Sequence, residues 1–436
     1  MIDNISFIGL GKLGLPLACC FAKNGVKVTG VDLNENLISS LISGATPFHE
    51  PNLTELLDAA KENITYQTTL KDVEKTDVTV ILVNTPNDPK TSAFSNHQIL
   101  SALESLCDHL LKTGKEKHDF VLSSTVLPGT IRDIIVPLIE NRMGWTLNKE
   151  FRFAYVPDFV ALGTVIRDFE QPNLMVLGES DKTFGDDVLE LYDRIITNGQ
   201  VTHRMNTSEA ELTKITFNAF LLSKVSFVNF IGNVCEKFGD ANVDVITNAV
   251  ASDKRISHET KMFFKAGLSW GGACWTRDVW AFQEMCRKIN LNPHHIWAAE
   301  KINKDQDQIM IDRIRATGKK KIGFFGVAFK PDTHLTLHSV AEKITGELVQ
   351  AGYEIHCHDF VDGAISEFYG KFGNDVRYHK DVKECLKKVD VAVILTPCKE
   401  YKEILDMRDG QTIIDGWRML EVDNDPTVIQ PGKIKL

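Results

Sequence analysis

The sequence predicts an α/β protein in which two Rossmann-like, doubly wound domains are joined by a central helical segment. Short apolar runs alternate with helix-length segments up to about residue 177, and the same alternation returns after residue 321. Between them, apolar positions repeat at helical spacing with few turn residues. Alternating strands and helices are typical of a parallel sheet covered on both faces. We therefore expect three segments, 1–205, 206–317 and 318–436.

The N-terminal segment begins with a β-α-β unit. We expect a strand at 5–9, a helix through 17–22, and a second strand at 26–31 that ends at Asp32. The further strands expected in this segment are 78–83, 120–123, 153–156 and 175–177.

The rest of the chain predicts helices first and then a second sheet. Residues 208–238 and 294–316 carry helical periodicity. After the basic stretch Lys319-Lys320-Lys321, strands are expected at 322–326, 354–358, 391–395 and 412–414, with a helix at 339–351.

Composition excludes several classes of protein. The 436 residues carry a formal net charge of −10, which argues against nucleic acid or a membrane surface as partner. The residues before the first strand do not resemble a secretion signal, so none is expected, and no uninterrupted apolar run reaches the roughly 18 to 20 residues of a spanning helix. The nine cysteines form no CxxC pair, so we expect reduced thiols in the cytoplasm and no metal site.

The first turn predicts a dinucleotide site. Gly9, Gly11 and Gly14 form a GxGxxG turn, with Lys12 and Leu13 inside it, between a strand and a helix. Backbone there can approach a pyrophosphate, and Asp32 at the end of the next strand can accept hydrogen bonds from a ribose diol. Asp32 would repel a 2′-phosphate, and Leu33 and Asn34 supply no compensating cation, so the cofactor expected is NAD.

Six segments along the chain carry a resemblance to a known family. They are the GxGxxG turn, Val83-Asn84-Thr85-Pro86, Ser124-Thr125-Val126-Leu127-Pro128-Gly129-Thr130, Glu209 to Asn218, Gly271-Gly272-Ala273-Cys274-Trp275-Thr276-Arg277-Asp278, and Gly326 to Thr333. In their order and spacing the chain resembles the UDP-glucose/GDP-mannose dehydrogenase family over nearly its whole length. The resemblance implies an N-terminal NAD-binding domain, a central dimerisation segment, and a C-terminal domain that binds a nucleotide sugar. It also implies a homodimer or higher homo-oligomer.

Cys274 is the expected nucleophile. Oxidising a primary alcohol to an acid removes two hydrides, and a cysteine can hold the intermediate aldehyde as a thiohemiacetal and then a thioester. Cys274 follows two glycines and is expected at the start of a helix, where the helix dipole favours the thiolate. The family reaction implied is oxidation of the C6 alcohol of a nucleotide sugar to a uronic acid.

The other site residues follow from the motifs. Asp278 shares a helix face with Cys274 and could position or deprotonate the hydrolytic water, and Lys214 and Asn218 are an i, i+4 pair. By resemblance, Lys214 and Asn218 stabilise an oxyanion and fix a water, Thr125 holds the catalytic water, and Asp158 replaces a family glutamate that acts as base or positions water. The remaining residues that the resemblance assigns are Thr85, Pro86, Ser124 and Thr125 for NAD, and Phe159, Val160, Gly271, Gly272, Lys330 and Arg418 for the substrate. For Lys330 and Arg418 a plain surface cation is an equal alternative.

Several positions depart from the family pattern, including Arg277, which stands where a lysine is typical. Asp158 is a shortened acid, Leu162 stands for a second glutamate, Leu174 for an arginine, and Leu337 begins a changed Arg-Glu-Ser-Pro segment. These changes remove charge from the substrate side and leave the groups proposed for chemistry. They predict an unusual sugar or nucleotide, such as an N-acetylated or deoxy sugar.

Two other functions remain open at this point. A two-electron hydroxyacid dehydrogenase would share the N-terminal fold and a catalytic lysine, but it leaves Cys274 and the C-terminal domain without a role. A protein that binds nucleotide sugar or NAD without turnover would explain the departures, but not the retained reactive groups.

Overall fold

The computed structural model describes residues 2–256, 263–422 and 425–433. The chain divides into two compact units, one formed by Met1–Phe217 with Trp280–Met285 and the other by Asn218–Val279 with Cys286–Leu436. These units differ from the three predicted segments, whose boundaries stay a prediction.

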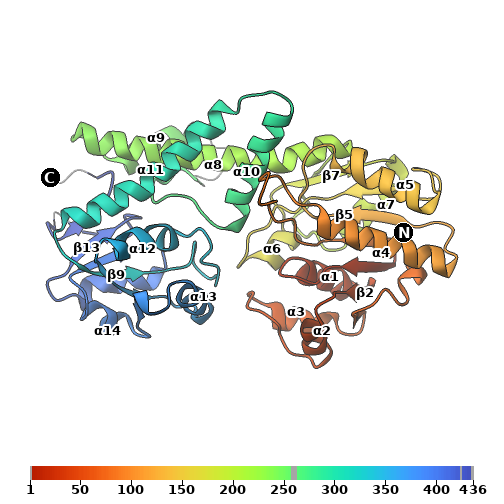
Figure 1. The fold of residues 1–436 in the computed structure, drawn as a ribbon, viewed down its shortest axis with the longest axis horizontal. Helices are drawn as coiled ribbons and strands as arrows, with labels where there is room; N and C mark the ends of the chain where they lie inside the picture. Colours follow the sequence, from red (N-terminus) through yellow and green to blue (C-terminus); the bar gives the residue numbers. More distant parts are fainter. Residues whose placement is uncertain (1, 257–262, 423–424, 434–436) are drawn as a thin grey trace. The chain divides into compact units, whose positions relative to one another are not determined.

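The first unit is a mixed sheet with helices on both faces (Figure 1). Its strands are β1 (Asn4–Ile8), β2 (Lys27–Val31), β3 (Ile64–Gln67), β4 (Val78–Ile81), β5 (Asp119–Leu122), β6 (Phe153–Tyr155), β7 (Met175–Glu179) and β8 (Thr202–Met205). Its helices are α1 (Gly14–Lys23), α2 (Glu35–Ile42), α3 (Leu53–Ala60), η1 (Val73–Lys75), α4 (His97–Thr113), η2 (Ile131–Ile135), α5 (Val136–Met143), α6 (Val165–Glu170) and α7 (Lys182–Asp193).

The strand order in this sheet is β3-β2-β1-β4-β5-β6-β7-β8. Adjacent residues of one strand enter different apolar cores: Phe7 belongs to the core that includes residues of α1, α6 and α7, whereas Ile8 belongs to the core that includes residues of α4 and α5. Because successive side chains point to opposite faces, the sheet is covered on both sides, as predicted. The prediction of a fully parallel sheet is wrong at one place, since β6 and β7 pair antiparallel. Strand β7 follows only the short helix α6, and strand direction leaves no trace in hydrophobic pattern.

The second unit contains the other sheet. Its strands are β9 (Lys321–Phe325), β10 (Glu354–His358), β11 (Val376–Tyr378), β12 (Val391–Ile394), β13 (Thr412–Asp415) and β14 (Val428–Ile429). Its helices are α9 (Val243–Ala251), α11 (His294–Ala316), α12 (Val340–Gln350), α13 (Asp362–Phe372), η3 (Gly373–Asp375), α14 (Val382–Leu386), η4 (Lys399–Glu403) and α15 (Ile404–Met407). Two further helices, α8 (Thr207–Phe238) and α10 (Ala273–Lys288), contribute residues to both units.

The second sheet repeats the topology of the first. Its order is β11-β10-β9-β12-β13-β14, all parallel, which matches β3-β2-β1-β4-β5-β6. The turn after the first strand is also alike: Gly326 has φ +89° where Gly9 has +97°. Asp359, at the end of the second strand, accepts the N–H groups of Val327 and Ala328 at 2.8 and 3.1 Å. Both sheets therefore use a carboxylate after the second strand to hold the first turn.

Helix α8 corrects one expectation. By length and composition alone it could cross a membrane, with a mean hydropathy of 1.4 over 18 residues, half of them buried. No spanning helix was expected here, because polar residues interrupt the apolar ones and no uninterrupted apolar run is long enough. The helix is apolar on its packed face and also carries exposed aromatic side chains, so isolated polar residues do not lower the average enough.

Candidate active site

The glycine turn after β1 leaves room for a diphosphate. A Cβ on Gly9 would meet the Leu82 carbonyl oxygen at 2.3 Å, and one on Gly14 would meet the Gly9 oxygen at 2.0 Å. Gly11, in contrast, has no atom within 4 Å of its Cβ position. No side chain caps the N-terminus of α1. The two outer glycines allow the tight turn, and the open side at Gly11 faces a helix terminus suited to an anion.

Asp32 lies where a ribose diol would bind. Its Oδ2 accepts the N–H of Leu10 at 2.8 Å and its Oδ1 accepts that of Asn34 at 2.9 Å. Leu33 beside it is 87 % exposed. Each carboxylate oxygen keeps a lone pair, so the turn and Asp32 together fit NAD as the sequence predicted.

The ends of β4 and β5 are joined through Ser124. Its hydroxyl donates to the carbonyl of Val83 and accepts the Val83 N–H, both at 2.8 Å. Thr85, two residues further on, is buried, Pro86 is exposed, and Thr125 is half-buried. The structure thus brings the predicted residues of the two loops together at the carboxyl edge of the first sheet.

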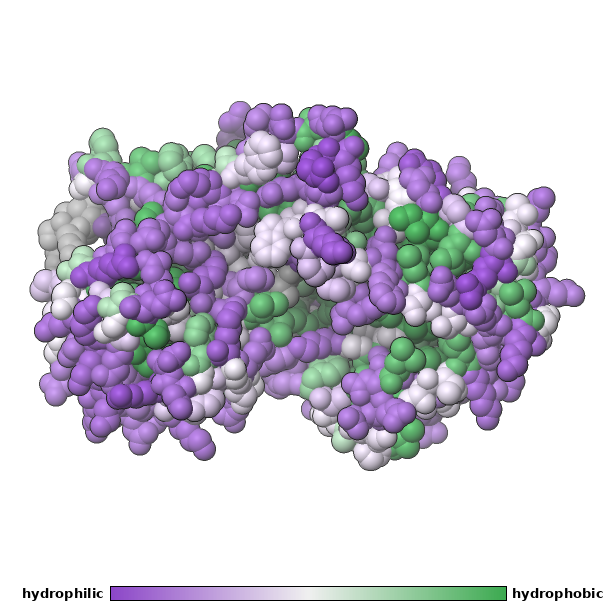
Figure 2. Space-filling model, viewed as in Figure 1, coloured by the Kyte–Doolittle hydropathy of each residue, from purple (hydrophilic) through white to green (hydrophobic). Residues whose placement is uncertain are grey.

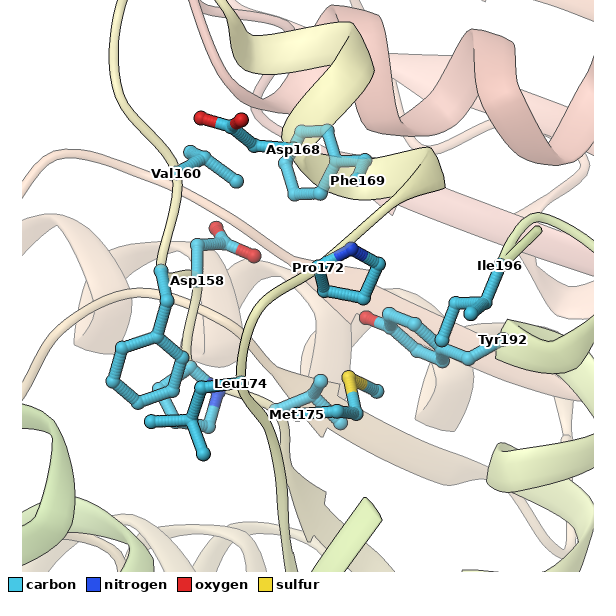
Figure 3. A pocket seen from close by; sticks show the side chains of 12 residues that line it. Asp158, Val160, Asp168, Phe169, Pro172, Leu174, Met175, Tyr192 and Ile196 are labelled. Atoms are coloured by element: carbon cyan, nitrogen blue, oxygen red, sulfur yellow. The ribbon is translucent and has the colours of Figure 1, made fainter. Parts of the chain in front are cut away.

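Asp158 faces a small cavity rather than Lys214. The Lys214 ammonium donates to the backbone carbonyl of Asp158 and lies 4.8 Å above the Phe159 ring. The Asp158 Oδ2 is buried and has no hydrogen-bond partner among the described residues. Figure 3 shows this carboxylate beside Val160 and Pro172. These three residues line a cavity of about 30 Å³. That is room for about one water molecule. Burial raises the pKa of Asp158 to about 7, which the nearby Lys214 charge only partly opposes.

Two leucines that depart from the family pattern lie in apolar surroundings in this unit. Leu174 lines the same cavity, with Phe169, Met175 and Tyr192. Leu162 packs on the apolar core that contains α1. Both leucines therefore have apolar partners of their own, which explains how the chain tolerates the loss of charge at these positions.

Cys274 differs from every other cysteine. It is exposed in the second position of α10, whereas the other eight are buried, and all nine are free thiols. Burial raises the pKa of Cys19, Cys107 and Cys357 to about 12, which makes these thiols poor nucleophiles at neutral pH. The accessible thiol is the one that the sequence singled out.

Asp278 lies one helical turn after Cys274 and is 2 % exposed. Its Oδ2 accepts a hydrogen bond from the Asn218 amide, and its Oδ1 accepts one from Arg277 Nε at 3.0 Å. The structure therefore brings two predicted residues, Asn218 and Asp278, into contact. Arg277 was named only as a departure in the motif, and its side chain fixes the carboxylate.

The glycines before Cys274 lie close to other parts of the chain, and their predicted contact with substrate stays a prediction. A Cβ on Gly271 would lie 1.9 Å from the His338 carbonyl oxygen, and one on Gly272 would lie 2.9 Å from the Phe329 ring. Neither position therefore has room for a side chain. Lys330, next to Phe329, is half-buried.

Arg418 is not a surface cation. Its side chain is 1 % exposed and donates to both carboxylate oxygens of Asp244 at 2.8 and 2.9 Å, and to the carbonyl oxygens of Ala266 and Pro431. The guanidinium is occupied by protein partners from α9 and two loops. Sequence spacing gave no sign of this, because Arg418 and Asp244 lie 174 residues apart.

Two buried glutamates were missed. Glu50 accepts the N–H groups of Gly163 and Val165, both at 2.8 Å, and so holds the loop that begins with Asp158. Glu211 accepts those of Gly129 and Ile131 at 2.6 and 2.8 Å. A glutamate three residues before Lys214 on the same helix was visible in the sequence, but its loop partners were not.

A turn that fits NAD, a doubly wound sheet around it, and a single accessible thiol on a helix define an NAD-dependent dehydrogenase. Models of three domains of one family match the chain: the NAD binding domain over 3–196, the central domain over 208–305 and the UDP binding domain over 323–422. The chain therefore belongs to the UDP-glucose/GDP-mannose dehydrogenase family, and it is an NAD-dependent nucleotide-sugar dehydrogenase.

Relatives agree over most of the chain. A UDP-glucose 6-dehydrogenase of Haloferax volcanii is 31 % identical, covering 96 % of this chain and 97 % of its own. A GDP-mannose 6-dehydrogenase of Pseudomonas putida is 29 % identical, covering 82 % and 80 %. Among solved structures, a UDP-glucose dehydrogenase from Pyrobaculum islandicum has a TM-score of 0.88 at 26 % identity, covering 99 % of this chain and 97 % of its own.

Proposed function

We propose that the protein oxidises the C6 primary alcohol of a nucleotide sugar to a carboxylate in two oxidations, with Cys274 as the covalent nucleophile. The observation that carries this is the exposure of Cys274 at the start of α10 while the other eight thiols are buried. A two-electron dehydrogenase needs no nucleophile, whereas an alcohol-to-acid enzyme must retain the aldehyde.

The substrate loses two hydrides in turn. The alcohol loses a hydride and a proton to give the aldehyde, and the Cys274 thiol adds to it to form a thiohemiacetal. Loss of a second hydride and proton gives a thioester, and water then releases the acid and restores the thiol. NAD, when bound, supplies an acceptor for each hydride, so two NAD are consumed per sugar.

The remaining groups have roles suited to their surroundings. Asn218 and Arg277 hold the Asp278 carboxylate, which positions water for thioester hydrolysis. Lys214 stabilises developing negative charge on the substrate oxygen, and Thr125 holds a water. Asp158, with a pKa of about 7, can hold or release a proton near neutral pH through water in its cavity.

The substrate is a nucleotide sugar that needs fewer charged contacts. Leu162 and Leu174 occupy apolar surroundings in place of charged family residues. An N-acetylated or deoxy sugar presents a less polar surface than glucose, so these are the substrates favoured.

Product stoichiometry tests the proposal. The purified protein is incubated with NAD and a panel of UDP-, GDP- and dTDP-sugars, and NADH formed per sugar consumed is counted. We expect two NADH and a carboxylate with at least one sugar, and no acid from Cys274→Ala. The buried Cys286→Ala is the matched control and should keep the ratio of two. A ratio of one would assign a two-electron dehydrogenase, and NADH binding with no turnover would assign a binding protein.

We also propose a homodimer that forms along α8, in a reducing cytoplasm where nine free thiols persist. Helix α8 exposes large apolar side chains at spacings of seven, three, four and four residues, which is the pattern of a helix-pairing seam. They are Phe220, Phe227, Phe230, Val234 and Phe238. Figure 2 shows apolar side chains along the edge where Figure 1 labels α9 and α8, and Val245 and Val250 of α9 extend the surface. This surface is proposed to meet a second copy of the chain and not a lipid bilayer.

A further inference from the structure

Glu211 is a buried carboxylate that the proposed chemistry does not use. It is 0 % exposed, and its two oxygens accept the N–H groups of Gly129 and Ile131 at 2.6 and 2.8 Å. The nearest charged side chains, Arg132 and Asp133, are exposed and paired with each other at 2.7 Å. The carboxylate is thus occupied by two backbone donors of one loop.

The loop that it holds has a defined turn. Pro128 and Gly129 are the central residues of a turn closed by the Thr130 N–H on the Leu127 carbonyl at 3.0 Å, and Gly129 has φ +88°. This is the geometry of a type II turn. Ile131 is the first residue of η2, and the side chain of Thr130 does not cap the N-terminus of this helix. Glu211 supplies that cap from α8.

The helix that carries Glu211 is itself tightly placed on the first sheet. A Cβ on Gly178 of β7 would meet Ala210 Cβ at 2.7 Å and Thr207 Cα at 2.9 Å, so the first turn of α8 lies directly against the strand. Because α8 is held against β7, Glu211 fixes the position of the loop. Lys214 lies about one turn further along the same helix.

The same loop begins with Ser124 and Thr125, at the carboxyl end of β5. In a doubly wound sheet each half binds one mononucleotide, and Asp32 assigns the adenosine to the half that contains β2. The ends of β4 and β5 then face the nicotinamide half. Ser124 links the two ends through its hydrogen bonds to Val83.

We propose that Glu211 is a positioning residue for NAD, which sets the Ser124–Thr125 loop so that it receives the nicotinamide half of the cofactor. The proposal rests on NAD binding and is independent of the chemistry assigned to Cys274.

The binding of two ligands, NADH and ADP-ribose, tests this proposal without any sugar substrate. NADH contains the nicotinamide and ADP-ribose lacks it, so their dissociation constants separate the two halves of the site. In Glu211→Gln one acceptor oxygen becomes an N–H₂ group facing a backbone N–H. We expect the Kd of NADH to rise about tenfold, as for the loss of about 1.4 kcal/mol. The Kd of ADP-ribose should stay within about twofold, which is little more than the scatter expected between such variants.

Glu209→Gln is the matched control, because it makes the same charge change two residues away, where the Glu209 side chain accepts the Asn206 N–H at 3.0 Å and not the N–H groups of the Gly129 loop. Both of its dissociation constants should remain those of the wild type. Equal weakening of NADH and ADP-ribose in Glu211→Gln would reduce Glu211 to a purely structural residue, and no weakening of either would overturn the proposal.

Amide hydrogen exchange of the wild-type protein gives a second measurement that does not depend on a variant folding. The Gly129 and Ile131 amides should be strongly protected despite lying at a turn and a helix start. Exchange at the rate of an unstructured loop would show that Glu211 does not hold them.

Discussion

At the scale of single residues, Asp158 shows how burial of an acidic side chain changes the pH at which it loses its proton. The carboxylate is one methylene shorter than the family glutamate, and its Oδ2 ends in a cavity next to Leu174 instead of reaching the Lys214 ammonium. Its pKa of about 7 follows from that burial. The residue type could be read from the sequence, but the direction of the side chain could not.

This burial predicts a pH-dependent stability. The unfolded chain loses the Asp158 proton near its usual pKa of about 3.9, while the folded protein keeps it until about pH 7. The free energy of unfolding of the wild type therefore falls as pH rises from about 4 to about 7. Asparagine does not titrate, so the melting temperature of Asp158→Asn relative to wild type should rise across the same window, measured by differential scanning fluorimetry.

Asp168 provides the comparison for this test. It lines the same cavity, but its Oδ2 accepts hydrogen bonds from the Ala161 N–H and the Thr164 hydroxyl. Asp168→Asn should lower the melting temperature, because it weakens both bonds. A difference between Asp158→Asn and wild type that stays flat from pH 4 to 7 would contradict the burial of an uncharged acid.

At the scale of elements, Arg418 joins α9 to the loop after β13. Removing the guanidinium leaves Asp244 half-buried without its partner, so we expect Arg418→Ala to lower the free energy of unfolding by about 3 kcal/mol. Arg418→Lys should recover only part of this, since a lysine cannot make the bidentate contact. Urea denaturation followed by circular dichroism measures both.

The exposed pair of Arg255 with Asp253 is the control, and Arg255→Ala should leave the free energy of unfolding close to that of the wild type, because solvent screens an exposed pair. If Arg418→Ala raised the KM for the sugar nucleotide and left stability unchanged, Arg418 would be a substrate residue, as the family resemblance first indicated.

The elements themselves were largely predictable. Strand β12 is a continuous apolar run, β1 has apolar residues at three of its five positions, and α8 and α11 have helical periodicity, so these elements could be recognised in the sequence. The missed strands β3, β8, β11 and β14 are short and lie toward the sheet edges, where burial is partial and the pattern is weak. The glycine turn, Asp32 and Cys274 could be singled out from the sequence, because the role proposed for each needs a particular residue type at a fixed place. Long-range pairs such as Glu50 with Gly163 leave no local pattern.

At the scale of the whole molecule, the exposed seam of α8 predicts the assembly. Phe227 is 55 % exposed at the middle of the seam, and burying a phenylalanine side chain contributes about 1.5–3 kcal/mol. Phe227→Glu places a charge in the proposed interface, so the protein should elute as a monomer in size-exclusion chromatography with light scattering.

Phe360→Glu is the matched change outside α8, at a side chain that is 45 % exposed, and it should leave the dimer intact. A wild-type protein that is monomeric at micromolar concentration, or a Phe227→Glu variant that is still dimeric, would exclude the seam as the contact.

The repeated strand order has a consequence for how the chain acquires its structure. Two stretches of one polypeptide form sheets with the same order of parallel strands, β2-β1-β4-β5 and β10-β9-β12-β13. Each of these sheets requires long crossover connections. During refolding of the full-length chain, a strand of one sheet can pair wrongly with the strand of the other sheet that corresponds to its native neighbour. On the ribosome the first stretch emerges and folds before the second exists. Vectorial synthesis thus removes a competition that a denatured full-length chain must face.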